Sequence, residues 1–324
     1  MSLSTTLPRT LSIEHNNRTG FASLAAGGLR MDSFPMRLLR RGNQKFWNPE
    51  DIDFSQDAKD FAAMDEPAQR AVCVSAAGFM AGEESVTQDI QPFMRAMAAE
   101  GRLADEAYLT QFAFEEAKHM QGFRMWFDAV GLTGNLHEYV DDNPAYAAIF
   151  LDAQPKAMFA LVDDPSPAAQ IRASVVYNHI VEGTLALTGY YAWQKVFAAT
   201  GALPGMRHLI KHISDDERRH MAWGTFTCRR HVAADGANWD VVQQCVEELR
   251  EPAIELLVAR RRKLEQEGKP SPFGTTSQEL AAYANRKLDR RLASIRSARG
   301  RSPQEIDQDY SPMELEDRLS KDDQ

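Results

Sequence analysis

The chain has 324 residues, of which 44% are hydrophobic and 26% charged, a composition typical of a globular protein with one large domain or two ordinary ones. The formal net charge of −9 argues against a nucleic acid as the partner of the whole chain. The three cysteines form no CxxC pair, and their odd number argues against a disulfide framework and favours a reducing, cytoplasmic compartment.

The N-terminus has no apolar core of signal-peptide length, and no run of about 18 apolar residues occurs in the chain. We therefore expect a cytoplasmic protein without a transmembrane segment. Residues 1–50 contain several glycines and prolines, and we expect them to form an irregular segment that packs on a helical domain. The basic cluster of this segment is interpreted as a solvated helix face rather than an anion site; it comprises Arg37, Arg40, Arg41 and Lys45.

From residue 66 onward, apolar residues recur with the period of a helix, and few prolines interrupt the pattern. Four long helices are predicted at 66–98, 103–130, 168–199 and 205–233. The connection between the second and the third is expected to contain one or two short helices. Two further helices are expected at 240–266 and 277–298.

No stretch shows the sustained alternation of apolar and polar residues that is typical of a half-buried strand. Together with the long connection in the middle, this predicts an all-α protein. We expect residues 51–298 to form a ferritin-like four-helix bundle with additional C-terminal helices. Residues 299–324 are expected to form a charged tail that is partly disordered.

Two of the predicted helices each carry a Glu-x-x-His motif. FEEAKHM contains Glu116 and His119, and DDERRHM contains Glu217 and His220. Residues three apart lie on one face of a helix, so each pair can hold one metal ion. A single motif of this kind also arises by chance, so the two motifs alone are only suggestive.

Two further glutamates complete a repeated pattern. Glu83 precedes Glu116 by 33 residues and Glu182 precedes Glu217 by 35 residues, and both stand in apolar stretches of predicted helices. One Glu from each of two helices and one Glu-x-x-His from each of two others form the ligand set of di-iron and di-manganese carboxylate bundles. Carboxylates with one imidazole per ion suit iron or manganese, and two cations would offset the buried negative charges.

Several polar residues lie next to these candidates. Glu84 and Glu115 point about 100° away from the ligand face, so we expect them to support the ligands or to form ion pairs. Asp216 either accepts a hydrogen bond from a metal-bound imidazole or is a solvated charge. His179 is interpreted as a hydrogen-bonded core or rim histidine rather than a third ligand, since each ion already has a histidine.

These motifs, with FWNPEDIDFS, AGEESVTQDIQPFM and YNHIVEGTLALTGYYAW, resemble the ligand-binding oxidases of the ribonucleotide reductase small-subunit group over about residues 21–315. The resemblance implies a heterodinuclear Mn/Fe cofactor, a long-chain fatty acid bound through its carboxylate across the two ions, a homodimer and an electron donor that the sequence does not identify. It also implies the ligand sets. Manganese in site 1 would be held by Glu83, Glu116 and His119, and iron in site 2 by Glu182, Glu217 and His220, with Glu116 bridging.

The resemblance further implies an ether crosslink between Val86 and Tyr177, formed with dioxygen as the oxidant. Val86 lies three residues after Glu83 and shares its helix face. Tyr177 lies about 140° around an ideal α-helix from Glu182, so it can reach the site only from the side or through a distortion such as a π-bulge.

Two aromatic residues bear on the expected mechanism. Phe123 occupies the position at which the resemblance places the radical tyrosine of reductase small subunits, which disfavours a tyrosyl-radical mechanism. Tyr190 either lines a cavity and bonds to groups around the metals or is a plain core tyrosine. Glycines near the ligands either leave room for a ligand tunnel or allow close helix packing; they are Gly78, Gly82, Gly183 and Gly189.

The sequence thus predicts an oxidoreductase that activates dioxygen. The alternative is a ribonucleotide reductase small subunit that passes an oxidising equivalent to a large subunit, although the tail has no aromatic residue after Tyr310 to relay it. A third interpretation, metal storage in a ferritin-like cage, is disfavoured by the C-terminal helices and by the single occurrence of each ligand.

Overall fold

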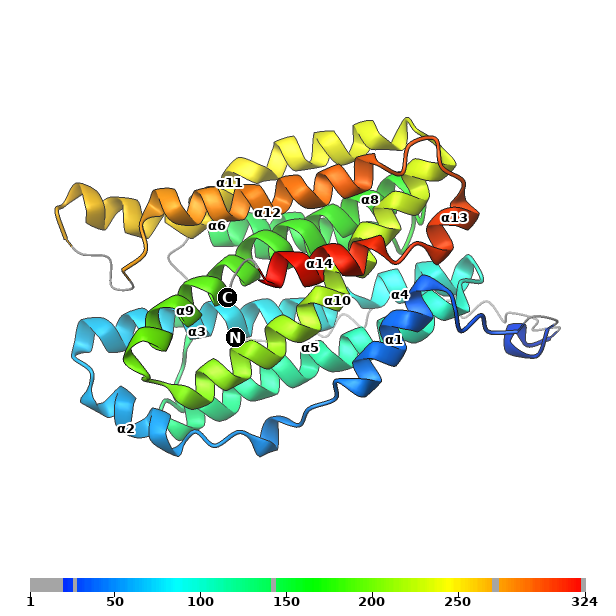
Figure 1. Cartoon of the computed structure of the whole chain (residues 1–324). Helices are drawn as coiled ribbons and strands as arrows, with labels where there is room; N and C mark the ends of the chain where they lie inside the picture. Colours follow the sequence, from blue (N-terminus) through cyan, green and yellow to red (C-terminus); the bar gives the residue numbers. More distant parts are fainter. Residues whose placement is uncertain (1–19, 26–27, 141–143, 270–273, 322–324) are drawn as a thin grey trace, which may run out of the picture.

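The computed structural model describes residues 20–25, 28–140, 144–269 and 274–321, and these residues form helices and no strands (Figure 1). The all-α fold expected from the sequence is therefore confirmed. None of the described helices combines the length and the apolar composition that crossing a membrane requires.

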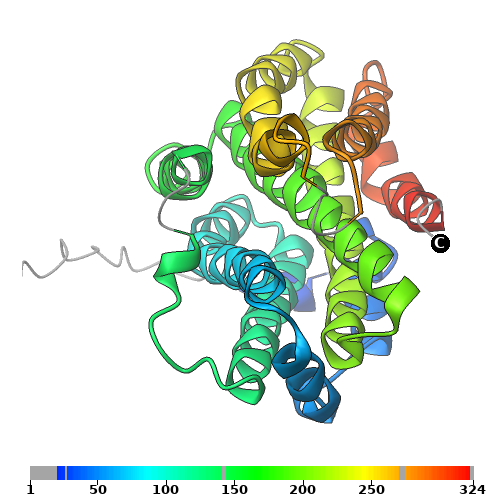
Figure 2. The same cartoon turned by 90° about the vertical axis from the view of Figure 1, so that its left-hand side faces the viewer.

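Four long helical segments form the central bundle (Figures 1 and 2). They are α3 (Glu66–Asp89), α5 (Leu103–Ala129), the continuous segment α8–η5–α9 and α10 (Pro204–Ala234). The third segment joins α8 (Pro167–Ser174), the π-helix η5 (Val175–Ala186) and α9 (Leu187–Thr200). α3 packs on α5 and η5 packs on α10, which is the ferritin-like arrangement predicted from the four long apolar patterns.

The remaining helices surround this bundle. In Figure 2, α11 (Asn238–Gln266) and α12 (Ser277–Arg296) lie beyond η5 and α9, on the side away from α3 and α5, and both contact η5. They are the additional C-terminal helices expected from the sequence. The shorter helices are η1 (Ala22–Leu24), α1 (Phe34–Gln44), η2 (Pro49–Asp51), α2 (Ser55–Ala63), α4 (Gln91–Ala99), η3 (His137–Tyr139), α6 (Pro144–Tyr146), the π-helix η4 (Ala147–Ala153), α7 (Gln154–Ala160), α13 (Pro303–Gln308) and α14 (Ser311–Lys321).

Local chemistry explains where the first long helix begins and ends. The side chain of Asp65 caps α3 by accepting a hydrogen bond of 2.9 Å from the backbone N–H of Ala68. We expected one helix over 66–98, but the structure divides it at Ile90 into α3 and α4. Pro92 in the first turn of α4 has no N–H to continue the ladder, and it fits the start of a new helix.

The expectation of an irregular segment over residues 1–50 is wrong for residues 34–44, which form α1. The helix packs on α5 and α10 and buries Phe34, Met36 and Leu38. Arg40 and Lys45 are exposed, as expected of a solvated face. Arg41 is not solvated in this way, because its guanidinium donates to both carboxylate oxygens of Asp317 at 2.9 and 2.6 Å.

Within the described residues the tail forms α13 and α14 after α12, whereas the expectation of partial disorder concerned the end of the tail, residues 321–324. α14 buries Met313, Leu315 and Leu319, and its Glu316 forms a buried ion pair of 2.7 Å with Arg291 of α12. These contacts stabilise a helix in a stretch whose charged composition alone does not favour burial. Residues 322–324, which the same expectation covers, lie outside the described residues. The division of the chain into units at residues 50 and 298 stays a prediction.

Candidate metal centre

The six residues predicted as metal ligands meet at the centre of the bundle, and each is at most 5% exposed. Their ligand atoms form two groups, within each of which all atoms lie within 4.8 Å of one another. The first group contains Glu83, Glu116, His119 and Glu217, and the second contains Glu116, Glu182, Glu217 and His220.

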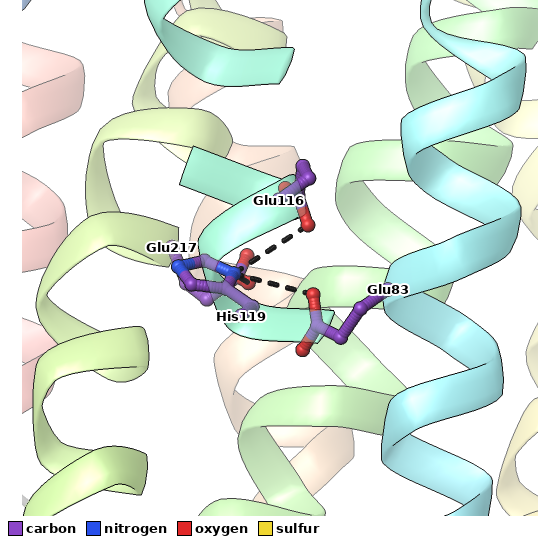
Figure 3. Close-up of side chains that lie close together, drawn as sticks. All are labelled: Glu83, Glu116, His119 and Glu217. Carbon is purple, nitrogen blue, oxygen red and sulfur yellow. Dashed lines mark hydrogen bonds and ion pairs between the residues drawn. The ribbon is translucent and has the colours of Figure 1, made fainter. Parts of the chain in front are cut away.

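In the first group, one imidazole nitrogen faces three carboxylates from three helices (Figure 3). Nδ1 of His119 lies 3.2 Å from Oε2 of Glu83 and 3.5 Å from Oε2 of Glu116. It also lies 3.5 Å from Oε1 of Glu217, which extends from α10. Three carboxylates around one imidazole are a donor set for a hard divalent cation such as iron or manganese.

The second group repeats this arrangement around His220. Its Nδ1 lies 2.9 Å from Oε1 of Glu116, 3.5 Å from Oε1 of Glu182 and 3.5 Å from Oε2 of Glu217. Glu116 therefore presents one oxygen to each histidine, as a bridging ligand would. Glu217 does the same, although the sequence motif indicated only its pairing with His220.

The protonation equilibria of these residues fit a site for two cations. Burial raises the pKa of Glu83 and of Glu182 to about 7, and burial with the charge of Glu116 raises the pKa of Glu217 well above its ordinary value. Oε1 of Glu182 and Oε2 of Glu217 have no well-aligned hydrogen-bond partner among the described residues. Buried carboxylate and imidazole atoms that converge on one place form a donor set that two cations would satisfy.

Asp216 holds the imidazole of His119 from its outer side. Nε2 of His119 lies 3.2 Å from Oδ2 of Asp216, which also accepts a hydrogen bond of 2.8 Å from the indole N–H of Trp47. Arg219 donates to the other oxygen of Asp216 at 2.6 Å. Burial favours the neutral acid, but the hydrogen bond from His119 and the charge of Arg219 outweigh it and lower the pKa of Asp216. Asp216 is thus a buried carboxylate that orients His119, and the alternative of a solvated charge is wrong.

Glu115 contacts the outer nitrogen of His220 in the same way as Asp216 contacts that of His119. Its Oε2 lies 2.9 Å from Nε2 of His220, and its Oε1 accepts a hydrogen bond of 2.6 Å from Arg219. The expectation that Glu115 supports a ligand is therefore confirmed, whereas Glu84 is exposed. Sequence reasoning missed Trp47 and Arg219. The only signal for Arg219 was its place between Glu217 and His220, and Trp47 is too distant in sequence to give one.

The two tyrosines of the site donate to carboxylates of the first group. The hydroxyl of Tyr190 lies 2.6 Å from Oε1 of Glu83, and its role around a metal site stays a prediction. The hydroxyl of Tyr177 lies 3.2 Å from Oε1 of Glu116. Phe123 is fully buried and stacks on Phe79 with ring centroids 5.7 Å apart, so this position contributes no polar atom.

The expected helix distortion is present. Tyr177 and Glu182 both lie in the π-helix η5. In a helix with i→i+5 hydrogen bonds, residues five apart are separated by a smaller angle around the axis than in an α-helix, which brings the two side chains closer to the same side. His179 in the same helix is buried, but neither ring nitrogen has a hydrogen-bond partner among the described residues. The expectation that it is hydrogen-bonded is therefore wrong for these residues.

An apolar cavity of about 280 Å³ borders the two groups. At the buried end its walls include Glu83, Glu116, Glu182 and Glu217, and Val86 lies beside them. Aliphatic and aromatic side chains from α3, η5, α9 and α11 form most of the remaining wall.

The glycines near the ligands divide between two roles. Gly78, Gly82 and Gly189 line the cavity, and a Cβ at Gly78 would meet nothing within 4 Å. A Cβ at Gly183 would lie 2.9 Å from the backbone oxygen of Asn178, and one at Gly189 would lie 2.6 Å from the ring of Phe79. Gly78 thus leaves open space, whereas Gly183 and Gly189 allow close packing.

Comparison with known proteins gives one consistent result. The model of the family "ribonucleotide reductase, small chain" matches residues 34–298. The crystal structure of an R2-like ligand-binding oxidase from Sulfolobus acidocaldarius has 31% sequence identity and a TM-score of 0.79, covering 89% of this chain and 98% of that one. An R2-like ligand-binding oxidase with an aerobically reconstituted Mn/Fe cofactor has 34% identity and a TM-score of 0.79, covering 86% and 98%. A variant of such an oxidase with an Fe/Fe cofactor matches with the same values.

Proposed function

This chain belongs to the ribonucleotide reductase small-chain family, and we propose that it is an R2-like ligand-binding oxidase, an oxidoreductase that uses a Mn/Fe pair and dioxygen. The observation that carries the proposal is the pair of carboxylate–histidine groups joined by Glu116 and Glu217, onto which an apolar cavity opens. A ferritin-like bundle with these donors but without such a cavity would support metal binding alone.

We assign the first group to manganese and the second to iron. Glu83, Glu116 and His119 would hold manganese, and Glu182, Glu217 and His220 would hold iron, with Glu116 between them. When bound, this metal pair would supply the activation of dioxygen, which the side chains alone do not supply.

The protein residues hold the ligand atoms in place and keep the site dry. Asp216 and Glu115 each bond to the outer nitrogen of one histidine, which leaves both Nδ1 atoms free to face the carboxylates. Burial and the nearby carboxylates raise the pKa of Tyr177 and of Tyr190 well above the ordinary value. Both tyrosines therefore remain hydrogen-bond donors to Glu116 and Glu83 across the physiological pH range.

For the ligand we propose a long-chain fatty acid whose carboxylate binds at the two metals and whose chain occupies the cavity. The apolar wall supports this choice, because burying methylene groups against it contributes about 0.8 kcal/mol for each group. The cavity volume of about 280 Å³ is near the lower end of the range of about 300–1,000 Å³ that small-molecule sites occupy.

We also propose the ether crosslink between Val86 and Tyr177. The bond joins Cβ of Val86 to the phenolic oxygen of Tyr177. The C–H and O–H bonds break, two protons leave, and the two electrons reduce dioxygen. The burial of Val86 beside the site and the contact between Tyr177 and Glu116 support this step.

One structural feature fits both the proposed role and the alternative role as a reductase small subunit. Trp47, Asp216 and His119 form a continuous hydrogen-bonded chain, and the Trp47 ring stacks on the half-buried His212 with centroids 4.9 Å apart. Such a chain can carry an electron between the surface and the first group in either role. A homodimer and a cytoplasmic location remain part of the proposal.

The test is metal loading under anaerobic conditions followed by exposure to air. We expect two metal ions per chain by elemental analysis and consumption of dioxygen by the loaded protein without a second subunit. Loading well beyond two ions per chain would indicate storage. Nucleotide reduction that appears only on adding a reductase large subunit would favour the alternative.

A further inference from the structure

The cavity that reaches the carboxylates has a basic outer end. Arg260 and Arg261 of α11 line the same cavity as Glu83 and Glu182. The glutamates are at most 5% exposed, whereas Arg260 is exposed and Arg261 is half-buried. The two arginines therefore stand where the cavity meets solvent, and the glutamates stand at its closed end.

Cationic side chains lie close to one another at this outer end. Burial together with the charge of Arg70 lowers the pKa of Arg260, and burial together with the charge of Arg260 lowers the pKa of Arg261. Glu265 near Arg261 acts in the opposite direction. A group of neighbouring guanidiniums of this kind is a region where an anion is stabilised.

Between these two ends the wall is apolar. Leu256, Leu257 and Leu264 of α11 line it with Leu280 of α12 and Phe150 of η4. A ligand that fills the cavity thus meets a polar site at the inner end, hydrocarbon along the middle and guanidinium groups at the outer end. A simple fatty acid matches only the first two parts, because its terminal methyl group forms no hydrogen bond with an arginine and takes water from it.

We propose that the ligand is a long-chain acid with a second anionic group, such as a carboxylate, at the end of the chain that lies far from the metals. This second group binds Arg260 and Arg261. The inference rests on the proposed function, which places the first carboxylate at the metal pair. It identifies the class of ligand as a two-ended amphiphile rather than a plain fatty acid.

The test measures binding of hexadecanoic and hexadecanedioic acid to the metal-loaded full chain by calorimetry, below their aggregation concentrations. We expect the diacid to bind about five- to tenfold more tightly, because the outer pair is partly exposed and screened. The double variant Arg260→Gln with Arg261→Gln should lose this difference and bind hexadecanoic acid no more weakly than the unmodified protein does. Arg260 is exposed and Arg261 is half-buried, so the fold should persist.

Arg262 provides the matched control. It belongs to the same basic run but does not line the cavity, and its guanidinium contacts Glu255 at 2.5 Å. Arg262→Gln should keep the preference for the diacid. An unchanged preference in the double variant, or equal binding of both acids by the unmodified protein, would overturn the inference.

The outcomes separate this inference from the proposed function. If hexadecanoic acid binds in a metal-dependent way but the diacid binds no more tightly, only the inference fails. If neither acid binds, or if both bind equally well after metal removal, the fatty-acid ligand of the proposed function fails and the inference fails with it.

Discussion

The hydroxyl of Tyr177 lies 3.2 Å from Oε1 of Glu116, a carboxylate that also contacts both histidines of the site. An ideal α-helix would direct Tyr177 about 140° away from Glu182. The π-helix η5 reduces this difference, and both residues reach the metal groups. The local backbone of η5 thus decides whether Tyr177 can take part in the chemistry of the site.

The first prediction concerns the crosslink. After anaerobic loading with manganese and iron and exposure to air, peptide mass spectrometry should show one joined peptide pair containing Val86 and Tyr177, lighter by two hydrogens than the sum of its parts. Tyr177→Phe removes the phenolic oxygen and should give only linear peptides with the metals still bound. Linear peptides from the unmodified protein after full loading would contradict the crosslink.

The second prediction concerns the proposed role of Glu116 as a ligand shared by the two metal ions. Glu116→Ala removes the oxygens that face both histidines, so we expect fewer than two metal ions per chain by elemental analysis. Glu84→Ala is the matched control, because Glu84 is an exposed neighbour of Glu83 and should be replaceable with full loading. Two tightly held ions in Glu116→Ala would show that Glu217, which also faces both histidines, is sufficient to join the groups.

The third prediction concerns the contact of Asp216 with His119, which orients the imidazole. Asp216→Asn keeps the shape of the side chain but removes the charge that orients the imidazole, and the affinity of the first group for its metal should fall about 10–100-fold. Competition with a chelator measures this affinity. Asp215→Asn is the control, since Asp215 pairs with Arg218 and contacts neither histidine. Equal metal affinities of the two variants would assign Asp216 a purely structural role.

Regular helix geometry made much of the site predictable. The i, i+3 spacing of Glu116 with His119 is a local property of an α-helix, so the sequence was sufficient to place them on one face. The convergence of two such pairs with Glu83 and Glu182 followed from the bundle topology. The bridging position of Glu217 was not predictable, because it depends on the distance between helices.

Tertiary contacts determine the features that the sequence did not predict. α1 and α14 have charged sequences, and they are helical because each buries a few apolar side chains against α10. Trp47 reaches Asp216 across 169 positions of the chain, a contact that no local pattern indicates. His179 was expected to have a hydrogen-bond partner, but the packing around η5 provides none among the described residues.

The fourth prediction separates the two roles of the glycines. Gly78→Ala adds a methyl group that meets nothing within 4 Å and lowers the entropy of the unfolded chain, so the free energy of unfolding should rise by about 0.5–1 kcal/mol. Gly183→Ala places a Cβ 2.9 Å from the backbone oxygen of Asn178. This substitution should lower the free energy of unfolding by about 1–3 kcal/mol. Urea unfolding of the metal-free proteins measures both changes in the free energy of unfolding. Loss of stability in Gly78→Ala would contradict the open space assigned to it.

The last prediction concerns pH and His179. Burial, together with the charge of Arg291, lowers the pKa of this imidazole to about 3. The unfolded chain, with an ordinary pKa of about 6.5, therefore binds a proton between pH 6.5 and 3 that the folded protein does not bind. The folded state loses stability as the pH falls through this range, and at pH 5 the loss from His179 alone is about 2 kcal/mol.

His179→Leu removes this proton uptake, so its free energy of unfolding should fall less between pH 7.5 and pH 5 than that of the unmodified protein. Urea unfolding of both proteins in the presence of a chelator gives the difference, in which the contributions of the other histidines cancel. His137→Leu, at an exposed position, is the matched control for the replacement of a histidine by leucine. Equal slopes for His179→Leu and the unmodified protein would mean that the folded protein accommodates a charged His179, because water or local opening reaches the ring inside η5.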